Sequence, residues 1–484
     1  MASQLEFTEE IIQKLFGHEA AEDEDPKRLQ QYYFKSSVYN QVITNLPIRI
    51  LVGHKGIGKS ALIKVAMAED KARNCLSVLI QPNDILNLGL DTSDFLHTIR
   101  DWTEGLKEII VNKVLYQLGV LSDLAPNVKN YRGAIIDFLI ETLTNLKSGE
   151  YAQDKQDIIL EFATHPQITV YVDDLDRGWQ GRREDITRIS ALLNAVRDLS
   201  NNNRSINFKI ALRSDVYYLV RTSDESTDKI EGSVIWHTWT NHEIFVLLVK
   251  RVETFFGRKI DETALLGVKQ ASLAKYLHSI MEQRFSGAGH WENAPMYRVL
   301  MSLIRKRPRD LVKLCTLAAR HAYSRKSSLI MAEDLKAIFE EYSQGRVQDT
   351  INEYRSELPE IERLLMSMRP SRRERTTREG YVYRTDTLMK KIDTILEGGQ
   401  FRFTNGKPAG SKELAAFLYK INFLTARKES SNGIIRKYFE ENRYLSSQFV
   451  DFGFDWEVHP AYRWALQPTE LSDIYASLQL SADG

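Results

Sequence analysis

Residues Gly53–Ser60 read GHKGIGKS, and this stretch decides the fold of the chain. It matches the phosphate-binding pattern G-x-x-x-x-G-K-[ST] at every fixed position, and such a loop must follow a strand and open a helix. The apolar run 48–52 before it predicts the strand, and the segment 61–67 after it predicts the helix. We therefore expect an α/β P-loop domain with a doubly wound parallel sheet.

The residue types in this loop suit the phosphates of a nucleotide. The glycines allow backbone N–H groups to curl around a β-phosphate, Lys59 places a cation between the β- and γ-phosphates, and the Ser60 hydroxyl ligates Mg²⁺. We expect ATP and Mg²⁺ as the bound groups. The predicted nucleotide-binding residues are Gly53, His54, Lys55, Gly56, Ile57, Gly58, Lys59, Ser60 and Ala61.

A second acidic motif follows the hydrophobic segment 168–172, which predicts another strand. Asp173 is expected to hold Mg²⁺ through water opposite Ser60, and Asp174 to polarise the water that attacks the γ-phosphate. Asp176 is expected to cap the following helix or to pair with an arginine. The alternative is that these three acids merely begin a solvated helix.

Two arginines are candidates for sensing the nucleotide. Arg213 follows the predicted strand 207–212, next to the γ-phosphate, where a guanidinium would stabilise developing charge; a structural ion pair with Asp215 is the alternative. Arg309 lies in RKRPRD, where Pro308 suits the first turn of a helix, and a solvated basic turn is the alternative. Candidates for an arginine that acts on a neighbouring subunit are Arg177, Arg182, Arg183 and Arg221.

Composition limits the class of protein. The 484 residues exceed one compact core, and a prior of about 150 residues per domain gives roughly three domains. The formal net charge is zero, so a basic surface must be local. The two cysteines, Cys75 and Cys315, indicate a reducing compartment, and we expect both to be core or inert residues. With no apolar stretch near 18 residues and no signal peptide at the start, we expect no membrane association and a cytoplasmic location.

The order of predicted elements divides the chain into four parts. Residues 1–30 form an acidic N-terminal segment, 31–240 a P-loop ATPase core, 241–355 a helical lid and 356–484 a winged-helix-like module. The core has five predicted strands: 48–52, 76–81, 168–172, 207–212 and 233–237. A helical subdomain is inserted at about 92–164. From residue 241 only helices are expected until the terminal module, among them an amphipathic helix at 263–285. In the terminal module, two short helices precede a β-hairpin near Gly453.

The motifs together resemble P-loop ATPases of the AAA+ and STAND type, which include Orc- and Cdc6-like initiators and KAP-type ATPases. The resemblance covers roughly residues 30–345 and rests on GHKGIGKS, YVDDLD, ALRSD, RPRDL and the helical lid. It implies ATP hydrolysis with catalytic roles for Lys59, Asp174 and Arg213. An aspartate at position 174 favours the STAND or KAP side, and the long insertion departs from replication initiators.

Other nucleotide-binding classes lack their motifs here. An N-K-x-D sequence, which a Ras-type GTPase needs, is absent, and FSGAG at 285–289 lies far after the acidic motif, unlike the signature of ABC proteins. A small-molecule kinase would usually be shorter. ATP is therefore the expected nucleotide.

Two functions remain open from the sequence. In the first, the chain is an oligomerising ATPase switch or motor in bacterial defence or DNA transactions, with an effector or regulatory protein as partner. In the second, it is an initiator- or repair-type ATPase that engages duplex DNA. The basic linker 369–378 would then contact phosphates, with a reader helix near 412–420 or 430–443; a solvated linker is the alternative.

Overall fold

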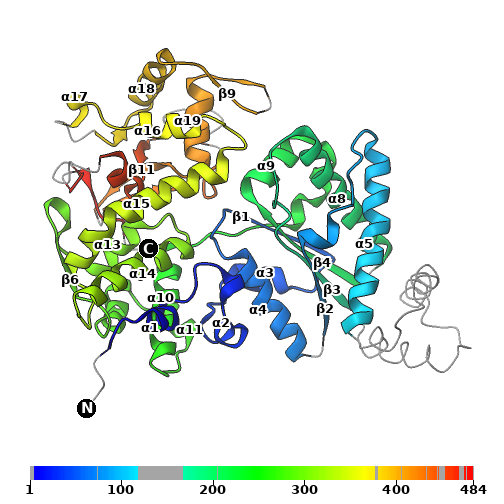
Figure 1. The fold of residues 1–484 in the computed structure, drawn as a ribbon, viewed down its shortest axis with the longest axis horizontal. Coiled ribbons are helices and arrows are strands. Elements are labelled where there is room, and N and C mark those ends of the chain that lie inside the picture. Colours follow the sequence, from blue (N-terminus) through cyan, green and yellow to red (C-terminus); the bar gives the residue numbers. More distant parts are fainter. Residues whose placement is uncertain are drawn as a thin grey trace, which may run out of the picture. The chain divides into compact units, whose positions relative to one another are not determined.

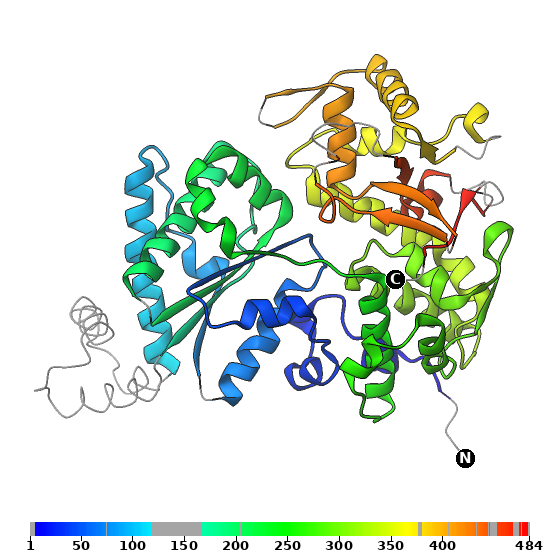
Figure 2. The ribbon, with the colours of Figure 1, turned by 180° about the vertical axis from the view of Figure 1, so that it is seen from behind.

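The computed structural model describes residues 5–117 and 167–482, apart from short gaps at 74, 204, 376–379, 405, 432, 444, 446–452, 468–473 and 476. The described chain forms two compact units (Figures 1 and 2). A sheet unit contains 35–54 and 59–237, and a helical unit contains 1–34, 55–58 and 238–484. The four residues 55–58 are the tip of the phosphate loop, so the loop contributes to both units.

The sheet unit is built on five parallel strands in the order β2-β3-β4-β1-β5. The strands are mostly apolar and mostly buried, as expected when both faces of a parallel sheet are covered, although β4 also buries Asn207 and Lys209. The expected doubly wound α/β fold is confirmed. The strands are β1 Ile48–Gly53, β2 Leu76–Ile80, β3 Ile168–Val172, β4 Ile206–Arg213 and β5 Val234–Trp236.

Helices cover both faces of this sheet, with α3 and α4 on one side and α5 and α8 on the other (Figures 1 and 2). The helices are α3 Ser37–Ile43, α4 Lys59–Ala72, α5 Phe95–Gln117, α8 Arg183–Asn202 and α9 Ser214–Ser223. Short 3-10 segments lie at Pro82–Ile85 and Glu225–Ser233. Helix α5 begins the expected helical insertion, and most of the rest of that insertion, 118–166, lies outside the described residues.

The helical unit begins with the N-terminal segment, which is folded. Helix α1, Glu9–Phe16, buries Ile12, Leu15 and Phe16 in the same core as α10 and α14. The acidic run also has structural roles, because Glu24 is buried and accepts hydrogen bonds from the Tyr32 hydroxyl and the His18 N–H. The other helices of this part are α2 Pro26–Tyr32, α10 Asn241–Phe255, α11 Glu262–Leu266, α12 Gln270–Leu273, α13 Met296–Leu303, α14 Pro308–Ser324 and α15 Ala332–Tyr354.

One expectation for this part was wrong. The segment 263–285 was expected to be one amphipathic helix and strands were expected to be absent, but it forms short helices followed by a two-stranded antiparallel hairpin. The hairpin strands are β6 Arg284–Ser286 and β7 Glu292–Pro295. Phe285 and Trp291, at this hairpin, are fully buried and pack edge to face in the core.

Helix α15 joins two cores of the helical unit. Its first half packs into the core of the lid helices, and its second half, from Val347, packs into the core of the C-terminal module. That module contains α16 Ile361–Ser367, α17 Arg372–Arg375, α18 Thr385–Glu397, α19 Ser411–Lys420 and α21 Arg463–Leu466, with strands β8 Val382–Tyr383, β9 Phe401–Arg402, β10 Pro408–Ala409, β11 Leu424–Ser430, β12 Gly433–Lys437 and β13 Asp455–Val458.

Helices α18 and α19 precede a β-hairpin, as expected, but the hairpin lies elsewhere. It is formed by β11 and β12 around Ser430–Gly433, and β13 joins the sheet in the order β12-β11-β13-β8. Residues 446–452, which would form the first arm of a hairpin near Gly453, lie outside the described residues. None of the helices in the described part is long and apolar enough to cross a membrane. Cys315 is buried, as expected for a core residue, whereas Cys75 is exposed, so of the two expectations for Cys75 the core residue is excluded and the inert residue stays a prediction.

Candidate nucleotide site at the carboxyl edge of the sheet

Three predicted site residues come to the same edge of the sheet because their strands are parallel. Strand β1 ends at Gly53, β3 ends just before Asp173, and β4 lies between them and ends at Arg213. Gly53 and Arg213 are paired in the sheet register. Ligands of open α/β sheets bind outside the carboxyl ends of the strands, and this is where the predicted residues meet.

Ser60 and Asp173, the two predicted magnesium ligands, are in direct contact. The Ser60 hydroxyl donates a hydrogen bond to the Asp173 carboxylate, although the two residues are far apart in sequence. Burial raises the pKa of Asp173 and the charge of Asp174 adds to this effect, whereas the Ser60 hydrogen bond and Lys59 act in the opposite direction. The two residues that were expected on either side of Mg²⁺ therefore lie within hydrogen-bonding distance of each other, and their role as metal ligands stays a prediction.

Lys59 begins helix α4 and turns back over the loop. Its ammonium group donates to the carbonyl oxygens of Gly53 at 2.9 Å and His54 at 3.2 Å. His237, which the sequence analysis placed only at the end of a strand, is also close to this lysine. It is buried, and burial together with the charge of Lys59 lowers its pKa to about 3, so the imidazole is neutral. The feature of the sequence that could have indicated this residue was a histidine directly after the fifth strand.

Asp174 has an unusual backbone. Its φ is 58°, a left-handed conformation that is uncommon outside glycine, and its side chain is exposed. Its N–H donates to Asp173 Oδ1 at 2.9 Å, which holds this turn against the buried neighbour. The three acids do not begin a helix, because α8 starts only at Arg183, so the solvated-helix alternative was wrong.

Arg213 is held by two carboxylates. Its Nε donates to Asp215 Oδ1 at 3.0 Å and its Nη2 to Asp215 Oδ2 at 2.7 Å, which is a two-point fork. Its Nη1 lies 3.3 Å from Asp176 Oδ2. The alternative of an ion pair with Asp215 is observed, and so is the expected pairing of Asp176 with an arginine. The sensor role of Arg213 stays a prediction.

The backbone carbonyls of the loop tip accept hydrogen bonds from residues of the helical unit. The Lys55 carbonyl accepts from Arg307 Nη1 at 3.2 Å, the Gly56 carbonyl from the Arg309 N–H at 3.4 Å, and the Ile57 carbonyl from Trp239 Nε1 at 2.8 Å. Among the residues that the structure describes, no hydrogen bond uses the N–H groups of Gly56, Ile57 or Gly58.

Arg309 does not extend into solvent. The carbons of its side chain lie beside Gly56, where an added Cβ would come within 3.0 Å of the arginine Cβ, and its Nε donates to the Glu19 carbonyl at 3.1 Å. Gly56 also has a φ of 78°, so a larger residue would be strained at this position. Pro308 opens α14 as expected. The role of Arg309 as a sensor stays a prediction.

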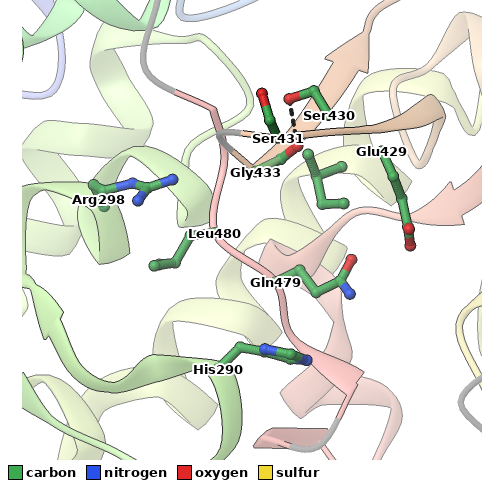
Figure 3. A pocket seen from close by; sticks show the side chains of 9 residues that line it. His290, Arg298, Glu429, Ser430, Ser431, Gly433, Gln479 and Leu480 are labelled. Atoms are coloured by element: carbon green, nitrogen blue, oxygen red, sulfur yellow. Dashed lines mark hydrogen bonds between the residues drawn. The ribbon is translucent and has the colours of Figure 1, made fainter.

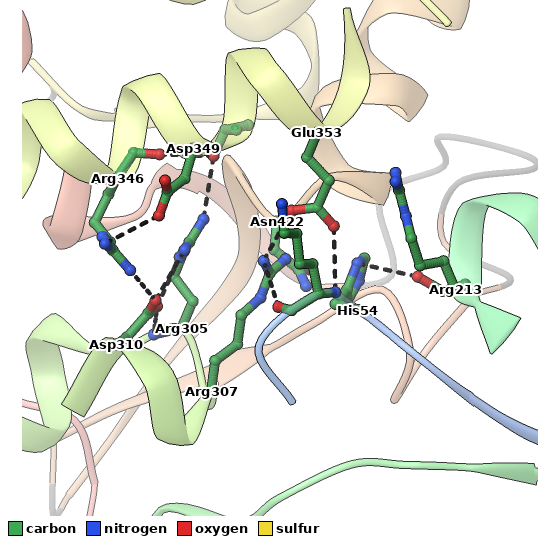
Figure 4. Close-up of polar contacts among 12 residues, drawn as sticks. His54, Arg213, Arg305, Arg307, Asp310, Arg346, Asp349, Glu353 and Asn422 are labelled. Atoms are coloured by element: carbon green, nitrogen blue, oxygen red, sulfur yellow. Dashed lines mark hydrogen bonds and ion pairs between the residues drawn. The ribbon is translucent and has the colours of Figure 1, made fainter. Parts of the chain in front are cut away.

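The turn that carries Arg309 is a buried charge network (Figure 4). Arg305 makes a two-point contact with Asp310 at 2.7 and 2.9 Å, and Arg346 donates to the same carboxylate at 2.7 Å. Arg307 donates to Glu353 at 3.2 Å, and Glu353 accepts the N–H of Lys55 at 3.3 Å. Arg305 and Arg307 are each 3% exposed. The alternative of a solvated basic turn was therefore wrong.

These residues fit MgATP. Ser60 and Asp173 supply the oxygen ligands that Mg²⁺ prefers, and Lys59 supplies a cation at the N-terminus of α4. Gly56 and Gly58 have φ of 78° and 107°, conformations that let successive N–H groups form an anion-binding concavity. The three tip N–H groups without an acceptor among the described residues complete this fit.

The fold and the site together define an α/β domain of the P-loop class. A family model described as the FunZ-associated C-terminal helical domain matches residues 269–351, which run from α12 into α15. The chain is 21% identical to the transposon gamma-delta 80.3 kDa protein of Escherichia coli (strain K12), covering 95% of this chain and 69% of that protein.

Among solved structures, the chain resembles a Walker-type ATPase of Pyrococcus abyssi, with 13% identity, a TM-score of 0.41, and coverage of 85% of this chain and 95% of that chain. It also resembles the Orc2 protein of Aeropyrum pernix, with 13% identity, a TM-score of 0.41, and coverage of 93% and 92%.

Two further surfaces of the helical unit bear on predicted partners. In the basic segment, Arg369, Arg372 and Arg373 are exposed, and residues 372–375 form α17, while 376–379 lie outside the described residues. The expected reader segment 430–443 contains β12, so the prediction of a helix there was wrong, whereas 412–420 is helical.

A polar pocket of about 560 Å³ lies between α13 and the β11–β12 turn (Figure 3) and contains no predicted nucleotide-binding residue.

Proposed function

We propose that the protein binds MgATP and hydrolyses it. The observation that carries this proposal is the hydrogen bond between Ser60 and Asp173, which joins the two halves of the motif pair at the carboxyl edge of the sheet. The loop lysine and the N–H groups of the loop tip lie in the same loop. This set of groups matches a triphosphate and its metal in both charge and donor type.

Each residue would have a separate task. Ser60 and Asp173 would hold the metal ion, whose charge offsets that of the β- and γ-phosphates. Lys59 would exchange its contacts with the loop carbonyls for phosphate oxygens. Asp174, exposed and the second residue after the strand, would accept a proton from the attacking water. Arg213 would stabilise charge on the transferred group once its fork with Asp215 turns towards it.

Two substitutions separate binding from turnover. We expect Lys59→Ala to abolish or greatly weaken ATP binding, because it removes the cation between the phosphates. We expect Asp174→Ala to keep ATP binding and to lower turnover by about a hundredfold or more. Both are measured by calorimetry and by phosphate release. Lys71→Ala, an exposed lysine on the same helix α4, is the control and should behave as the wild type. Equal turnover in wild type and Asp174→Ala would remove the hydrolysis assignment.

We extend the proposal to an oligomerising switch or motor in bacterial defence or DNA transactions, with an effector or regulatory protein as partner. The sequence resemblance to AAA+ and STAND ATPases supports this extension. Arg177, Arg182 and Arg183 are exposed and available to a neighbouring subunit, whereas Arg221 is paired with Asp228 and Glu231. Mass measured by light scattering with and without ATP tests it. A monomer under both conditions would contradict the oligomeric switch.

Duplex DNA is the second candidate partner, favoured by the exposed arginines Arg369, Arg372 and Arg373 in the C-terminal module. The candidate helix α19 is largely buried, with Ser411, Lys412 and Glu413 on its exposed first turn. We therefore propose contact with phosphates more than with base edges.

Salt dependence tests this contact. Replacing the three arginines with alanine should weaken DNA binding and reduce the slope of log K against log salt by about 2.7, because each released counterion contributes about 0.9. The control replaces the exposed lysines Lys27, Lys269 and Lys275 of the same unit. If wild-type turnover, mass and mobility all ignore duplex DNA at low salt, the DNA proposal fails and the protein-partner switch is favoured.

A further inference from the structure

We infer that Trp239, Arg307 and Glu353 are positioning residues that hold the tip of the phosphate loop in its phosphate-binding conformation. The inference rests on the proposed function and adds to it a set of residues that lie outside the nucleotide motifs. All three belong to the same compact unit as the loop tip, residues 55–58. The phosphate-binding pattern does not include any of these three residues.

The first observation is the direction of the hydrogen bonds at the tip. Three consecutive carbonyls, those of Lys55, Gly56 and Ile57, accept from Arg307, from the N–H of Arg309 and from Trp239. The N–H groups of Gly56, Ile57 and Gly58 have no acceptor among the described residues. Because each peptide unit is planar and trans, a bond that fixes a carbonyl also fixes the N–H on its other side. The bonded carbonyls therefore orient the free N–H groups.

The second observation is that the peptides flanking Lys55 are held on both sides. Glu353 accepts the Lys55 N–H at 3.3 Å, and Arg307 donates to the Lys55 carbonyl at 3.2 Å. Arg307 and Glu353 also pair with each other at 3.2 Å, and both are nearly fully buried (Figure 4). A buried ion pair has little freedom to move, because separating its partners leaves an uncompensated charge. It is therefore a rigid support for the loop.

The third observation is the anchor beneath the tip. The Ile57 side chain is 5% exposed and belongs to the core cluster that contains Trp239 and Phe34. The Trp239 ring packs against Phe34 with ring centroids 5.9 Å apart, so its Nε1 has a fixed direction towards the Ile57 carbonyl. Preorganised N–H groups cost less to order on binding, which is why fixing them raises affinity.

Trp239→Phe is the most selective test, because it keeps an aromatic ring in the core and removes the N–H donor. Loss of one such hydrogen bond should weaken ATP binding about fivefold, seen in Kd by calorimetry and in KM. Turnover at saturating ATP should stay within about twofold, because bound phosphates orient the same N–H groups. Arg307→Lys keeps the charge but removes the guanidinium, whose Nη1 donates to both the Lys55 carbonyl and Glu353, and it should raise KM in the same way.

Trp291→Phe is the matched control. Trp291 is fully buried in the same core cluster, and its Nε1 has no hydrogen-bond partner among the described residues. Its replacement removes the same atoms from the same core without removing a hydrogen bond, and should leave the Kd for ATP unchanged. If wild type binds ATP and Trp239→Phe binds equally well, or if both variants weaken binding alike, the positioning role is wrong. If wild type binds no ATP, the proposed function itself fails.

Discussion

The sheet unit and the helical unit each contain an arginine that forks onto an aspartate, and the two forks differ in their surroundings. In the sheet unit, Arg213 contacts Asp215 at 3.0 and 2.7 Å, with the arginine side chain 12% exposed. In the helical unit, Arg305 contacts Asp310 at 2.7 and 2.9 Å, and the side chains are 2% and 1% exposed. The pairwise geometry is the same, so the difference lies in what else each arginine touches.

The Arg305 guanidinium makes further hydrogen bonds besides those to Asp310. Its Nη1 donates to the Thr350 hydroxyl at 3.1 Å and to the Tyr462 hydroxyl at 2.8 Å, and Arg346 shares its aspartate. Arg213 has a looser third contact, 3.3 Å to Asp176, whose side chain is 23% exposed. An arginine with a partly solvated partner can exchange it for a phosphate oxygen, whereas a fully enclosed one cannot. Geometry of one pair therefore does not separate a functional arginine from a structural one.

Asp310→Asn should have the largest effect. It removes the charge that compensates Arg305 and Arg346, and leaving buried charges without their partner typically costs about 3–5 kcal/mol. We expect the free energy of unfolding in urea to fall by that amount, with the slope against urea unchanged. Asp349→Asn is the control, because Asp349 pairs with Arg346 at 3.0 Å but is 52% exposed, and it should cost less than about 1 kcal/mol. Equal losses in both variants would contradict the role of burial.

Arg213→Lys should act on turnover. Lysine keeps the positive charge but cannot form the two-point fork, so stabilisation of the transferred group should be lost. We expect turnover to fall about a hundredfold, as for loss of one well-placed donor, while ATP binding changes little. Arg73→Lys, in the same sheet unit and paired with Asp70 at 3.0 Å, is the control and should leave turnover unchanged. Normal turnover in Arg213→Lys would make Arg213 structural, like Arg305.

The sequence predicted the sheet unit more completely than the helical unit, for a physical reason. Buried parallel strands are continuous apolar runs, and the prediction 168–172 agrees with β3 residue for residue. Ser60 and Asp173 were expected to lie opposite each other across Mg²⁺, because the phosphate-binding motif implies which strand ends lie side by side. In 263–285, by contrast, apolar residues spaced like those of a helix fold into short turns and a hairpin, because the packing of Phe285 and Trp291 overrides the local pattern.

The support of the loop tip was outside the reach of local patterns. Lys55 and Glu353 are 298 residues apart, and neither residue type nor spacing indicates their contact. The turn RKRPRD was recognised as the start of a helix, but its burial was not, because five charges in six residues are typical of an exposed segment. Arg346 and Glu353, which are distant in sequence, pair with buried charges of this turn and so offset the cost of burying them.

Acid should weaken the Arg305–Asp310 pair in a defined pH window. Burial alone would raise the pKa of Asp310, but the charges of Arg305 and Arg346 outweigh it and hold the pKa well below the ordinary value of 3.8. Because the folded pKa is lowered, the stabilisation is present above about pH 4 and is lost as the pH falls further, by up to about 1.4 kcal/mol per pH unit. The stability of wild type should therefore approach that of Asp310→Asn between about pH 4 and pH 3. If the difference in stability between wild type and Asp310→Asn stays constant over this pH range, protonation of Asp310 is not coupled to unfolding.

Glu9→Gln should have the smallest effect, although Glu9 forms the same kind of fork. Arg320 Nε and Nη2 donate to its two oxygens at 2.7 and 2.9 Å, but the side chains are 47% and 59% exposed. Water competes with both partners, so the contact should contribute about 0.2–1 kcal/mol and less in high salt. Urea unfolding at low and high salt measures this. A loss near that of Asp310→Asn would mean that fork geometry outweighs burial, whereas a small, salt-sensitive loss places all three pairs on one scale set by exclusion of water.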